Sequence, residues 1–396
     1  MIETVIKNKI LLRLSEILQE QANAIIEANR LDAEAHPDMD DALRDRLKVD
    51  GKKIAAMSES LIKVAELEDP EGKILYEYTR PDGLTIENRS VPFGTILIIY
   101  ESRPDVTIEA AATAFKAGNR ILLKGGKESS HTNMFLTELW RQALSENGVD
   151  VSFVEYLNLS REETQRLIRN NIRKVDLIIP RGGDNLIRFV TENTSIPLII
   201  SGRGNNFLYV DDDCDFDMAV RIILNGKSRL SVCNALDKVL INENLPDIGL
   251  KTKCLVAALA GRDISSFGDK SVVAFDGRIT EDDSEDILFE EFLSAKVFFT
   301  LVSGVQEAIE KINAYSGGHS AVIVTHNAQK AAFFMQEVDC AAVYHNASTR
   351  FTDGGQFGAG AEIAISTQKL HFRGPIGAAQ LVTNKWYVFG DGHIRE

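Results

Sequence analysis

The chain has 396 residues, with 44 Lys plus Arg against 58 Asp plus Glu, which gives a formal net charge of −14. This length predicts two or three domains, and 44% hydrophobic with 26% charged residues is typical of a globular protein and too apolar for a disordered one. The charge argues against a general binder of nucleic acid or anionic membrane, because neutralising phosphates needs a surplus of Lys and Arg.

The N-terminal part is predicted to be helical before it turns to strands. Apolar residues recur at helical spacing over 2–28, which predicts one long amphipathic helix. Residues 30–70 are charged and helical in composition, with Pro70 as the expected stop. Residues 73–90 alternate apolar and polar side chains around a Pro-Asp-Gly turn, so we expect a β-hairpin there.

A regular alternation of strands and helices follows. Wholly apolar runs at 95–100 and 120–124 flank an Ala-rich helix at 107–117, which is the pattern of a βαβ unit with buried parallel strands. Further strands are expected at 151–157, 175–179 and 197–200. We therefore expect a doubly wound α/β domain that binds a nucleotide outside the carboxyl ends of its strands.

The second half repeats this style less regularly. Strands are expected at 238–242, 271–275, 296–299 and 321–325, and a helix at 304–314. The acidic segment 276–291 is interpreted as a solvated loop and helix.

Two glycine turns are candidates for phosphate binding. The turn Lys124-Gly125-Gly126-Lys127 lies where a strand ends, and Pro180-Arg181-Gly182-Gly183 lies between a strand and a helix, whose N-terminus favours an anion. The alternative for each is an ordinary turn. Neither is a P-loop, because Ile121 stands where that motif needs glycine, and the 202–207 segment lacks the third glycine of a dinucleotide fingerprint.

An acidic run at 211–217 invites a calcium interpretation that its spacing contradicts. The sixth position of an EF-hand loop must be glycine and is Phe216, and the twelfth, usually glutamate, is Ile222. We expect a solvated turn without a metal. The carboxylates around Cys214 would raise the pKa of its thiol, which makes this cysteine an unsuitable nucleophile.

The cysteines and apolar runs bear on compartment and reactivity. Four cysteines are too few for a disulfide framework, none is paired in a C-x-x-C motif, and no apolar run approaches the roughly 18 residues of a membrane span. No secretory signal is evident, so we expect a cytoplasmic protein. Cys233 follows Lys227 and Arg229, whose positive charge would favour a thiolate, although a buried, inert cysteine is the alternative.

Eight motifs in order along nearly the whole chain resemble the γ-glutamyl phosphate reductases, also called glutamate-5-semialdehyde dehydrogenases, a branch of the aldehyde dehydrogenase superfamily. The motifs are RPDGL at 80–84, VPFG at 91–94, IYESRPDVT at 99–107, LKGGKE at 123–128, DLIIPRGG at 176–183, SVCNA at 231–235, GHS at 318–320 and the block 350–375.

The resemblance implies an NADPH-dependent reduction of γ-glutamyl phosphate to glutamate 5-semialdehyde and phosphate, in proline biosynthesis. Cys233 matches the family nucleophile, which would form a thioester that accepts hydride. The oxyanion would be held by Asn234 or Ser102. No carboxylate occurs at 200–204, where aldehyde dehydrogenases carry the glutamate that activates water.

The resemblance also implies binding residues. Lys124 matches the lysine at the adenosine ribose, and Lys127 would neutralise a 2′-phosphate, which favours NADPH over NADH. The turn at 180–183 is assigned to the pyrophosphate. Arg103 and Arg350 are the expected partners of the anionic groups of the substrate, although either can instead be a structural ion-pair residue. Glu285, Glu290 and Glu291 compete for the nicotinamide ribose.

The resemblance predicts an aldehyde dehydrogenase-like α/β architecture. It consists of an NADP-binding domain at 1–225, a catalytic domain at 226–350 and a C-terminal return at 351–396. The hairpin at 73–90 and a final strand at 385–389 should form a homo-oligomer interface. A complex with the upstream glutamate kinase is a further expectation that no residue supports.

Two other functions stay open. One is an acylating dehydrogenase for another acyl phosphate or a coenzyme A thioester. The other is a degenerate paralogue that acts as a binding protein, motivated by the unusual residues at 203–207.

Overall fold

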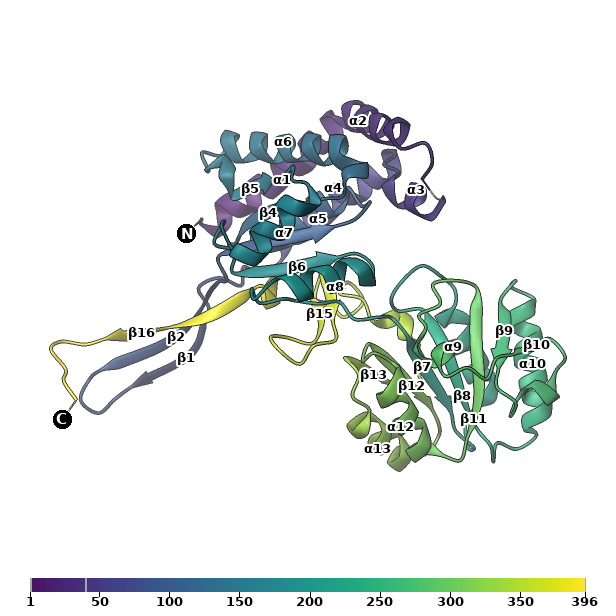
Figure 1. Ribbon diagram of the computed structural model, residues 1–396. Helices are drawn as coiled ribbons and strands as arrows, with labels where there is room; N and C mark the ends of the chain where they lie inside the picture. Colours follow the sequence, from purple (N-terminus) through teal and green to yellow (C-terminus); the bar gives the residue numbers. More distant parts are fainter. Residues whose placement is uncertain (1, 40, 396) are drawn as a thin grey trace. The chain divides into compact units, whose positions relative to one another are not determined.

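The computed structural model describes residues 2–39 and 41–395, which fold into two compact units (Figure 1). The first contains the chain up to Ile200, Gly358–Ala364 and the residues from Ile376 onward, and the second contains Ser201–Phe357 and Ile365–Pro375. The division therefore lies at 200/201, whereas the sequence analysis placed it at 225/226. The reason is that strand β7 (Asn206–Val210) and helix α9 (Phe216–Gly226) belong to the sheet of the second unit.

The first unit is built on a four-stranded parallel sheet in the order β5-β4-β3-β6. Its strands are β3 (Thr95–Tyr100), β4 (Arg120–Lys124), β5 (Val154–Tyr156) and β6 (Leu177–Arg181). Their apolar runs are buried on both faces, as expected for parallel strands between helical layers. The predicted doubly wound arrangement is confirmed.

Helices cover both faces of this sheet. One face packs on α1 (Thr4–Glu20), α4 (Gly51–Glu66), α5 (Val106–Lys116) and α6 (Ser130–Glu146), and the other on α7 (Arg161–Asn170) and α8 (Asp184–Asn193). The helix expected at 2–28 ends at Glu20, and α2 (Ala22–Ala35) and α3 (Asp41–Leu47) follow. No glycine or proline marks this break in the sequence. The expected strand at 197–200 is only a single bridge between Leu198 and Ile178.

A separate antiparallel sheet of the first unit joins β1 (Ile74–Thr79), β2 (Thr85–Pro92) and β16 (Val382–Phe389) in the order β1-β2-β16. It forms the slender ribbon that carries the C-terminus in Figure 1. The hairpin and the final strand are therefore confirmed as structure. All six residues of β1 are exposed.

The second unit contains a seven-stranded parallel sheet in the order β10-β9-β11-β8-β7-β12-β13. Besides β7, its strands are β8 (Leu236–Asn242), β9 (Ser265–Gly268), β10 (Ile279–Glu281), β11 (Lys296–Val302), β12 (Ser320–Val324) and β13 (Ala342–His345). Its helices besides α9 are α10 (Ile248–Ala260), α11 (Asp286–Phe289), α12 (Val305–Tyr315) and α13 (Ala328–Glu337).

Two details of the second unit differ from the expectations. The prediction of a strand at 271–275 is wrong, because β9 lies earlier and 273–275 is a short 3₁₀ helix. Strand β7 was not expected at all, although it lies centrally between β8 and β12. The remaining strands, β14 (Ala364–Ser366) and β15 (Gly374–Ile376), pair with each other. Among the described residues, no helix combines the length and hydropathy of a membrane span.

Candidate active site

A cavity of about 1000 Å³ opens at the carboxyl ends of β3 and β4 in the first unit. All four residues of the predicted turn 124–127 are among the residues that line it, and so is Ser102. Asn185, Leu186 and Phe189 of α8 also line it, so the N-terminal part of that helix faces the same space. A parallel sheet of this kind binds ligands at this edge, and the volume is that of a small-molecule or cofactor site.

A Cβ at Gly125 would clash with the buried Asn133, and a Cβ at Gly126 would displace the flexible end of the Glu128 side chain. A Cβ on Gly125 would lie 2.1 Å from Nδ2 of Asn133, and a Cβ on Gly126 would lie 2.0 Å from Oε1 of Glu128. The half-buried Lys124 ammonium donates to the Gly125 carbonyl at 2.6 Å, and burial lowers its pKa. A backbone cradle with an ammonium beside it fits an anionic dinucleotide.

The turn at 180–183 brings its backbone to the same edge. Pro180 and Arg181 end strand β6, and Gly183 is the N-cap of α8 without a side-chain cap. Its N–H instead donates to the carboxylate of Glu101 at 3.0 Å. The position expected to hold a pyrophosphate is therefore taken by an internal carboxylate.

Ser102 has a left-handed backbone, with φ of 34°, and its donors are engaged. Its hydroxyl and its N–H donate to Oε1 of Glu128 at 2.7 and 2.9 Å. Burial raises the pKa of Glu128, but these hydrogen bonds outweigh burial and lower it. Neither Glu101 nor Glu128 was predicted as a site residue, because a lone glutamate carries no signal of its own.

Cys233 lies in the second unit, at the amino end of β8, where it is half-buried. A Cβ on Gly204 would lie 2.0 Å from the Cys233 carbonyl oxygen and 2.4 Å from its Cα. Nδ2 of Asn206 donates to the Cys233 carbonyl at 2.7 Å and to the Ala235 carbonyl at 2.6 Å. The unusual 203–207 segment thus fixes the backbone of the candidate nucleophile.

Arg350 is a cation close enough to Cys233 to interact with it electrostatically, and Arg229 interacts with Arg350 in the same way. Burial and the charge of Arg229 lower the pKa of Arg350, while Asp353 and Cys233 act in the opposite direction. Nη1 of Arg350 is buried and has no hydrogen-bond partner in the described residues, so it can receive an anion. Lys227, expected to favour the thiolate, is instead fully buried in an ion pair with Asp237 at 2.6 Å.

Asn234 is buried and its amide supports the same segment. Nδ2 donates to the Arg350 carbonyl at 3.3 Å and to the Thr352 carbonyl at 3.0 Å, and Thr349 Oγ1 donates to the Asn234 carbonyl at 2.8 Å. These contacts hold the chain that carries Arg350. They leave the Asn234 amide without the freedom that an oxyanion donor needs.

The candidate glutamates and the other cysteines are also placed. Glu285 accepts from the Tyr315 hydroxyl at 2.9 Å, and the Glu290 carbonyl accepts from the buried Lys238 ammonium at 2.7 Å. Burial raises the pKa of both Cys214 and Cys340 to about 11, which makes them inert thiols.

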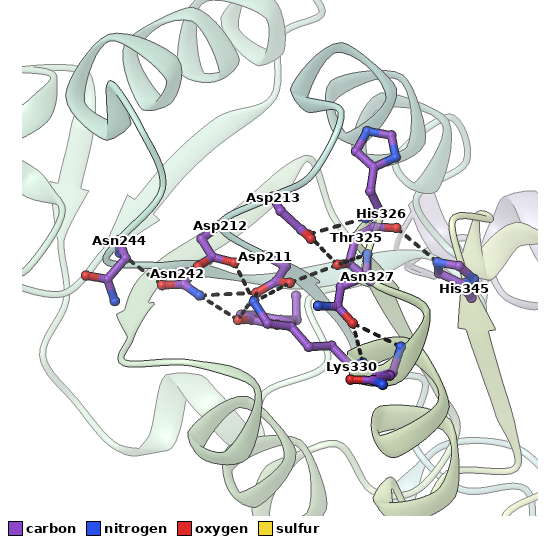
Figure 2. Close-up of polar contacts among 12 residues, drawn as sticks. Asp211, Asp212, Asp213, Asn242, Asn244, Thr325, His326, Asn327, Lys330 and His345 are labelled. Atoms are coloured by element: carbon purple, nitrogen blue, oxygen red, sulfur yellow. Dashed lines mark hydrogen bonds and ion pairs between the residues drawn. The ribbon is translucent and has the colours of Figure 1, made fainter.

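The acidic run expected to be a solvated turn is instead partly a buried network (Figure 2). The carboxylate of Asp211, at the end of β7, is fully buried and accepts from Tyr209 at 2.7 Å, Thr325 at 2.8 Å and the Lys330 ammonium at 2.9 Å. Asn242, at the end of β8, also donates to it, at 3.2 Å. Burial raises the pKa of Asp211, but these hydrogen bonds outweigh it and hold the pKa well below its usual range.

The three carboxylates at 211–213 offer oxygens within 4.8 Å of one another. The Lys330 ammonium also donates to Asp212, and Thr325 also donates to Asp213. Lys330 therefore supplies one positive charge beside two of these three carboxylates.

Comparisons with known proteins identify the family of this chain. A model of the aldehyde dehydrogenase family matches residues 4–260. A γ-glutamyl phosphate reductase from Clostridium acetobutylicum is 42% identical over 100% of this chain and 94% of its own, and one from Nitratiruptor sp. is 43% identical over 98% and 95%. The crystal structure of the γ-glutamyl phosphate reductase of Thermotoga maritima has a TM-score of 0.95 at 40% identity, covering 100% of this chain and 95% of that one.

A more distant structure has the same fold. An acetylating aldehyde dehydrogenase from Geobacillus thermoglucosidasius has a TM-score of 0.68 at 15% identity, with 100% of this chain and 94% of that chain covered.

Proposed function

Since the chain belongs to the γ-glutamyl phosphate reductases within the aldehyde dehydrogenase family, we propose that it reduces γ-glutamyl phosphate to glutamate 5-semialdehyde and phosphate in proline biosynthesis. The observation that carries the proposal is the half-buried Cys233, whose backbone is fixed by Gly204 and Asn206 and which lies near the unpartnered Nη1 of Arg350.

The cysteine performs the acyl transfer. The Cys233 thiolate attacks the acyl carbon, the carbon–oxygen bond to phosphate breaks, and inorganic phosphate leaves. Nicotinamide chemistry supplies the hydride that reduces the resulting thioester. The hemithioacetal anion on Cys233 then re-forms its carbonyl as the carbon–sulfur bond breaks, which releases the aldehyde and restores the thiolate.

The binding roles are proposed for the two arginines that the family motifs contribute. Arg350 offers a buried Nη1 to the phosphoryl group or the forming oxyanion, and Arg103 takes another anionic group of the substrate. The Cys233 N–H is the proposed donor to the oxyanion. Ser102 and Asn234 are engaged in other hydrogen bonds. This revises the expected roles of those two residues.

The first-unit cavity is proposed to hold NADPH. Lys124 would reach the adenosine ribose and Lys127 the 2′-phosphate, with Gly125 and Gly126 giving the backbone access. The pyrophosphate would take the N-terminus of α8 at Gly182 and Gly183, beside Pro180 and Arg181, once Glu101 releases the Gly183 N–H.

Cys233→Ser tests the chemistry. We expect loss of the phosphate-dependent oxidation of glutamate 5-semialdehyde by NADP, with an unchanged circular dichroism spectrum. The control is Cys254→Ser, at an exposed cysteine in α10. Undiminished turnover by Cys233→Ser contradicts the mechanism.

The same assay separates the alternatives. Running it with NADP and NAD, and with phosphate or coenzyme A as acyl acceptor, distinguishes this reductase from an acylating dehydrogenase that forms a coenzyme A thioester. Slow alkylation of Cys233 by iodoacetamide at neutral pH, without protection by substrate, would instead indicate a degenerate paralogue.

The exposed strands are proposed to form a homo-oligomer. Tyr76 and Trp386 contact each other edge to face at 5.8 Å between ring centroids, and both are about half exposed, at 52% and 54%. Apolar side chains on a strand with a free edge favour association. Light scattering at low concentration should give a multiple of 43.8 kDa, and a strict monomer would contradict this proposal. A cytoplasmic location and a glutamate kinase partner stay predictions.

A further inference from the structure

A chain of buried hydrogen bonds in the second unit ends close to Arg350. The Thr352 hydroxyl lies 2.7 Å from the hydroxyl of Ser320 and 2.7 Å from that of Tyr344. Nδ1 of His319 lies 2.8 Å from the Ser320 hydroxyl and extends the chain. Thr352, Ser320 and His319 are fully buried, and all of these residues belong to the second unit. The steps of the proposed reaction do not use this chain.

The turn that ends at Thr352 is fastened to the residue after Cys233. The turn is the short 3₁₀ helix Thr349–Phe351, and Thr352 is its C-cap residue. The Thr349 hydroxyl donates to the Asn234 carbonyl at 2.8 Å, and the Asn234 amide donates to the Thr352 carbonyl at 3.0 Å. These two hydrogen bonds hold the turn against the backbone of the candidate nucleophile.

The side chain of Arg350, in the middle of this turn, has little support of its own. Its Nη1 is buried and has no hydrogen-bond partner within the described part of the chain. The charges of Asp353 and Cys233 attract the guanidinium, and that of Arg229 repels it. A buried donor without a partner is costly and gains by moving toward water. The place of this guanidinium therefore depends on the backbone that carries it.

The chain of hydrogen bonds is insensitive to pH where thiols titrate. Burial lowers the pKa of His319 from 6.5 to about 4 and raises the pKa of Tyr344 to about 12. Both side chains are neutral between these two values. A change in the titration of Cys233 within that range therefore reports the charges near its sulfur, and not a protonation inside the chain.

We propose that Thr352 is a positioning residue of the proposed reaction. Its hydroxyl, held between Ser320 and Tyr344, fixes the turn that keeps the Arg350 guanidinium beside Cys233. Reactive groups need such a supporting layer, because small losses of position cost much of their effect. This inference rests on the proposed function, since Thr352 touches no substrate and acts through Arg350.

The test follows the alkylation of Cys233 by iodoacetamide against pH, with peptide mass spectrometry to separate this thiol from the other cysteines. Thr352→Val replaces the hydroxyl by a methyl group and releases the turn. The pH midpoint of alkylation should then rise by about 1 unit, because a nearby cation favours the thiolate. Tyr344→Phe should raise it by less, since Thr352 keeps Ser320 as a partner. Thr352→Ser retains the hydroxyl and should keep the wild-type midpoint.

Two further measurements separate positioning from a loss of stability. Thr325→Val removes the hydroxyl of another fully buried threonine of the second unit, which donates to Asp211. It should lower the free energy of unfolding and leave the alkylation midpoint as in wild type. In an Arg350→Gln background, Thr352→Val should raise the midpoint no further, because the charge that it positions is gone.

The contrary outcomes are distinct. A wild-type midpoint in both Thr352→Val and Tyr344→Phe overturns this inference, and so does an equal rise with and without Arg350. Tyr344→Phe alone decides where Thr352→Val does not fold. Alkylation needs no turnover, so a wild-type protein that is inactive on glutamate 5-semialdehyde overturns the proposed function by a separate measurement.

Discussion

The two parallel sheets are built alike, and yet their carboxyl edges differ. In the first sheet the order β5-β4-β3-β6 reverses between β3 and β6, and in the second the order reverses between β7 and β12. An acid directly follows the first strand of each reversal, Glu101 after β3 and Asp211 after β7. Such reversals are where open α/β sheets form a crevice for a ligand.

The first crevice is open and the second is closed. Glu101 is exposed and its carboxylate accepts from Gly183 beside a cavity of about 1000 Å³. Asp211 is fully buried. The position of a crevice at this edge is occupied by the side chains that donate hydrogen bonds to it, which are Tyr209, Asn242, Thr325 and Lys330. The topology supplies the position of a crevice, and the side chains that follow the strands decide whether a ligand can enter.

Removing the buried acid should have the largest effect. Asp211→Ala leaves the Lys330 ammonium and the Tyr209 hydroxyl without their shared acceptor, so we expect a loss of about 3–5 kcal/mol in the free energy of unfolding. Urea titration and hydrogen exchange of the β7 and β12 amides measure it. Asp212→Asn, which removes only a partly exposed partner of Lys330, should cost less than about 1 kcal/mol. Equal losses would show that the network does not close this edge.

At the amino edge of the second sheet, the buried His319 should make the free energy of unfolding depend on pH. His319 precedes β12 and is fully buried, and burial lowers its pKa from 6.5 to about 4. As the pH falls from 6.5 toward 4, the unfolded chain takes up a proton that the folded chain does not. The free energy of unfolding should therefore fall by about 1.4 kcal/mol per pH unit from this group.

The matched variant isolates that contribution. His319→Gln removes it, so the difference in slope between wild type and variant, from urea titrations at several pH values, reports His319 alone. Parallel slopes between pH 4 and 6.5 would contradict the buried, neutral imidazole.

At the carboxyl edge of the first sheet, removing the Lys124 ammonium should weaken NADPH binding without lowering the free energy of unfolding. Lys124→Met removes a half-buried ammonium whose burial already lowers its pKa, so the unfolding free energy should not decrease. NADPH binding, followed by its fluorescence, should weaken by roughly tenfold, because one charged contact is worth about 1.5 kcal/mol. A loss of stability comparable to that of Asp211→Ala would remove the distinction between the two edges.

The smallest effect is expected at Glu101. Glu101→Gln removes the negative charge beside the N-terminus of α8 and should tighten NADPH binding by roughly three- to fivefold. Equilibrium fluorescence titration measures it, with Glu138→Gln as a control away from the cavity. Weaker binding would indicate that the carboxylate holds the cofactor instead of competing with it.

The features that the sequence predicted correctly are marked by short runs of neighbouring residues. The turn 124–127 follows a short buried run and precedes a helix, and the glycines that the sequence marks do line a cavity. The doubly wound arrangement was also predictable, because buried parallel strands read as continuous apolar runs.

The predictions that failed concern residues whose contacts come from far along the chain. Five aspartates within seven residues indicate a solvated turn. Asp211 is nevertheless buried because it has distant donors, among them Lys330, which is 119 positions along the chain. The engagement of Ser102 by Glu128 likewise depends on two strand ends meeting in space. The position of β9 was missed because 271–275 is as apolar as a strand.

The pairing of β16 with β2 has a consequence for synthesis. The two strands join in register over Thr85–Pro92 and Val382–Phe389, about 290 residues apart. A ribosome therefore makes the whole second unit, for roughly 15 to 60 s, before the edge of β2 meets its final neighbour. During that interval the nascent ribbon exposes an incomplete sheet, the kind of surface on which a chaperone acts.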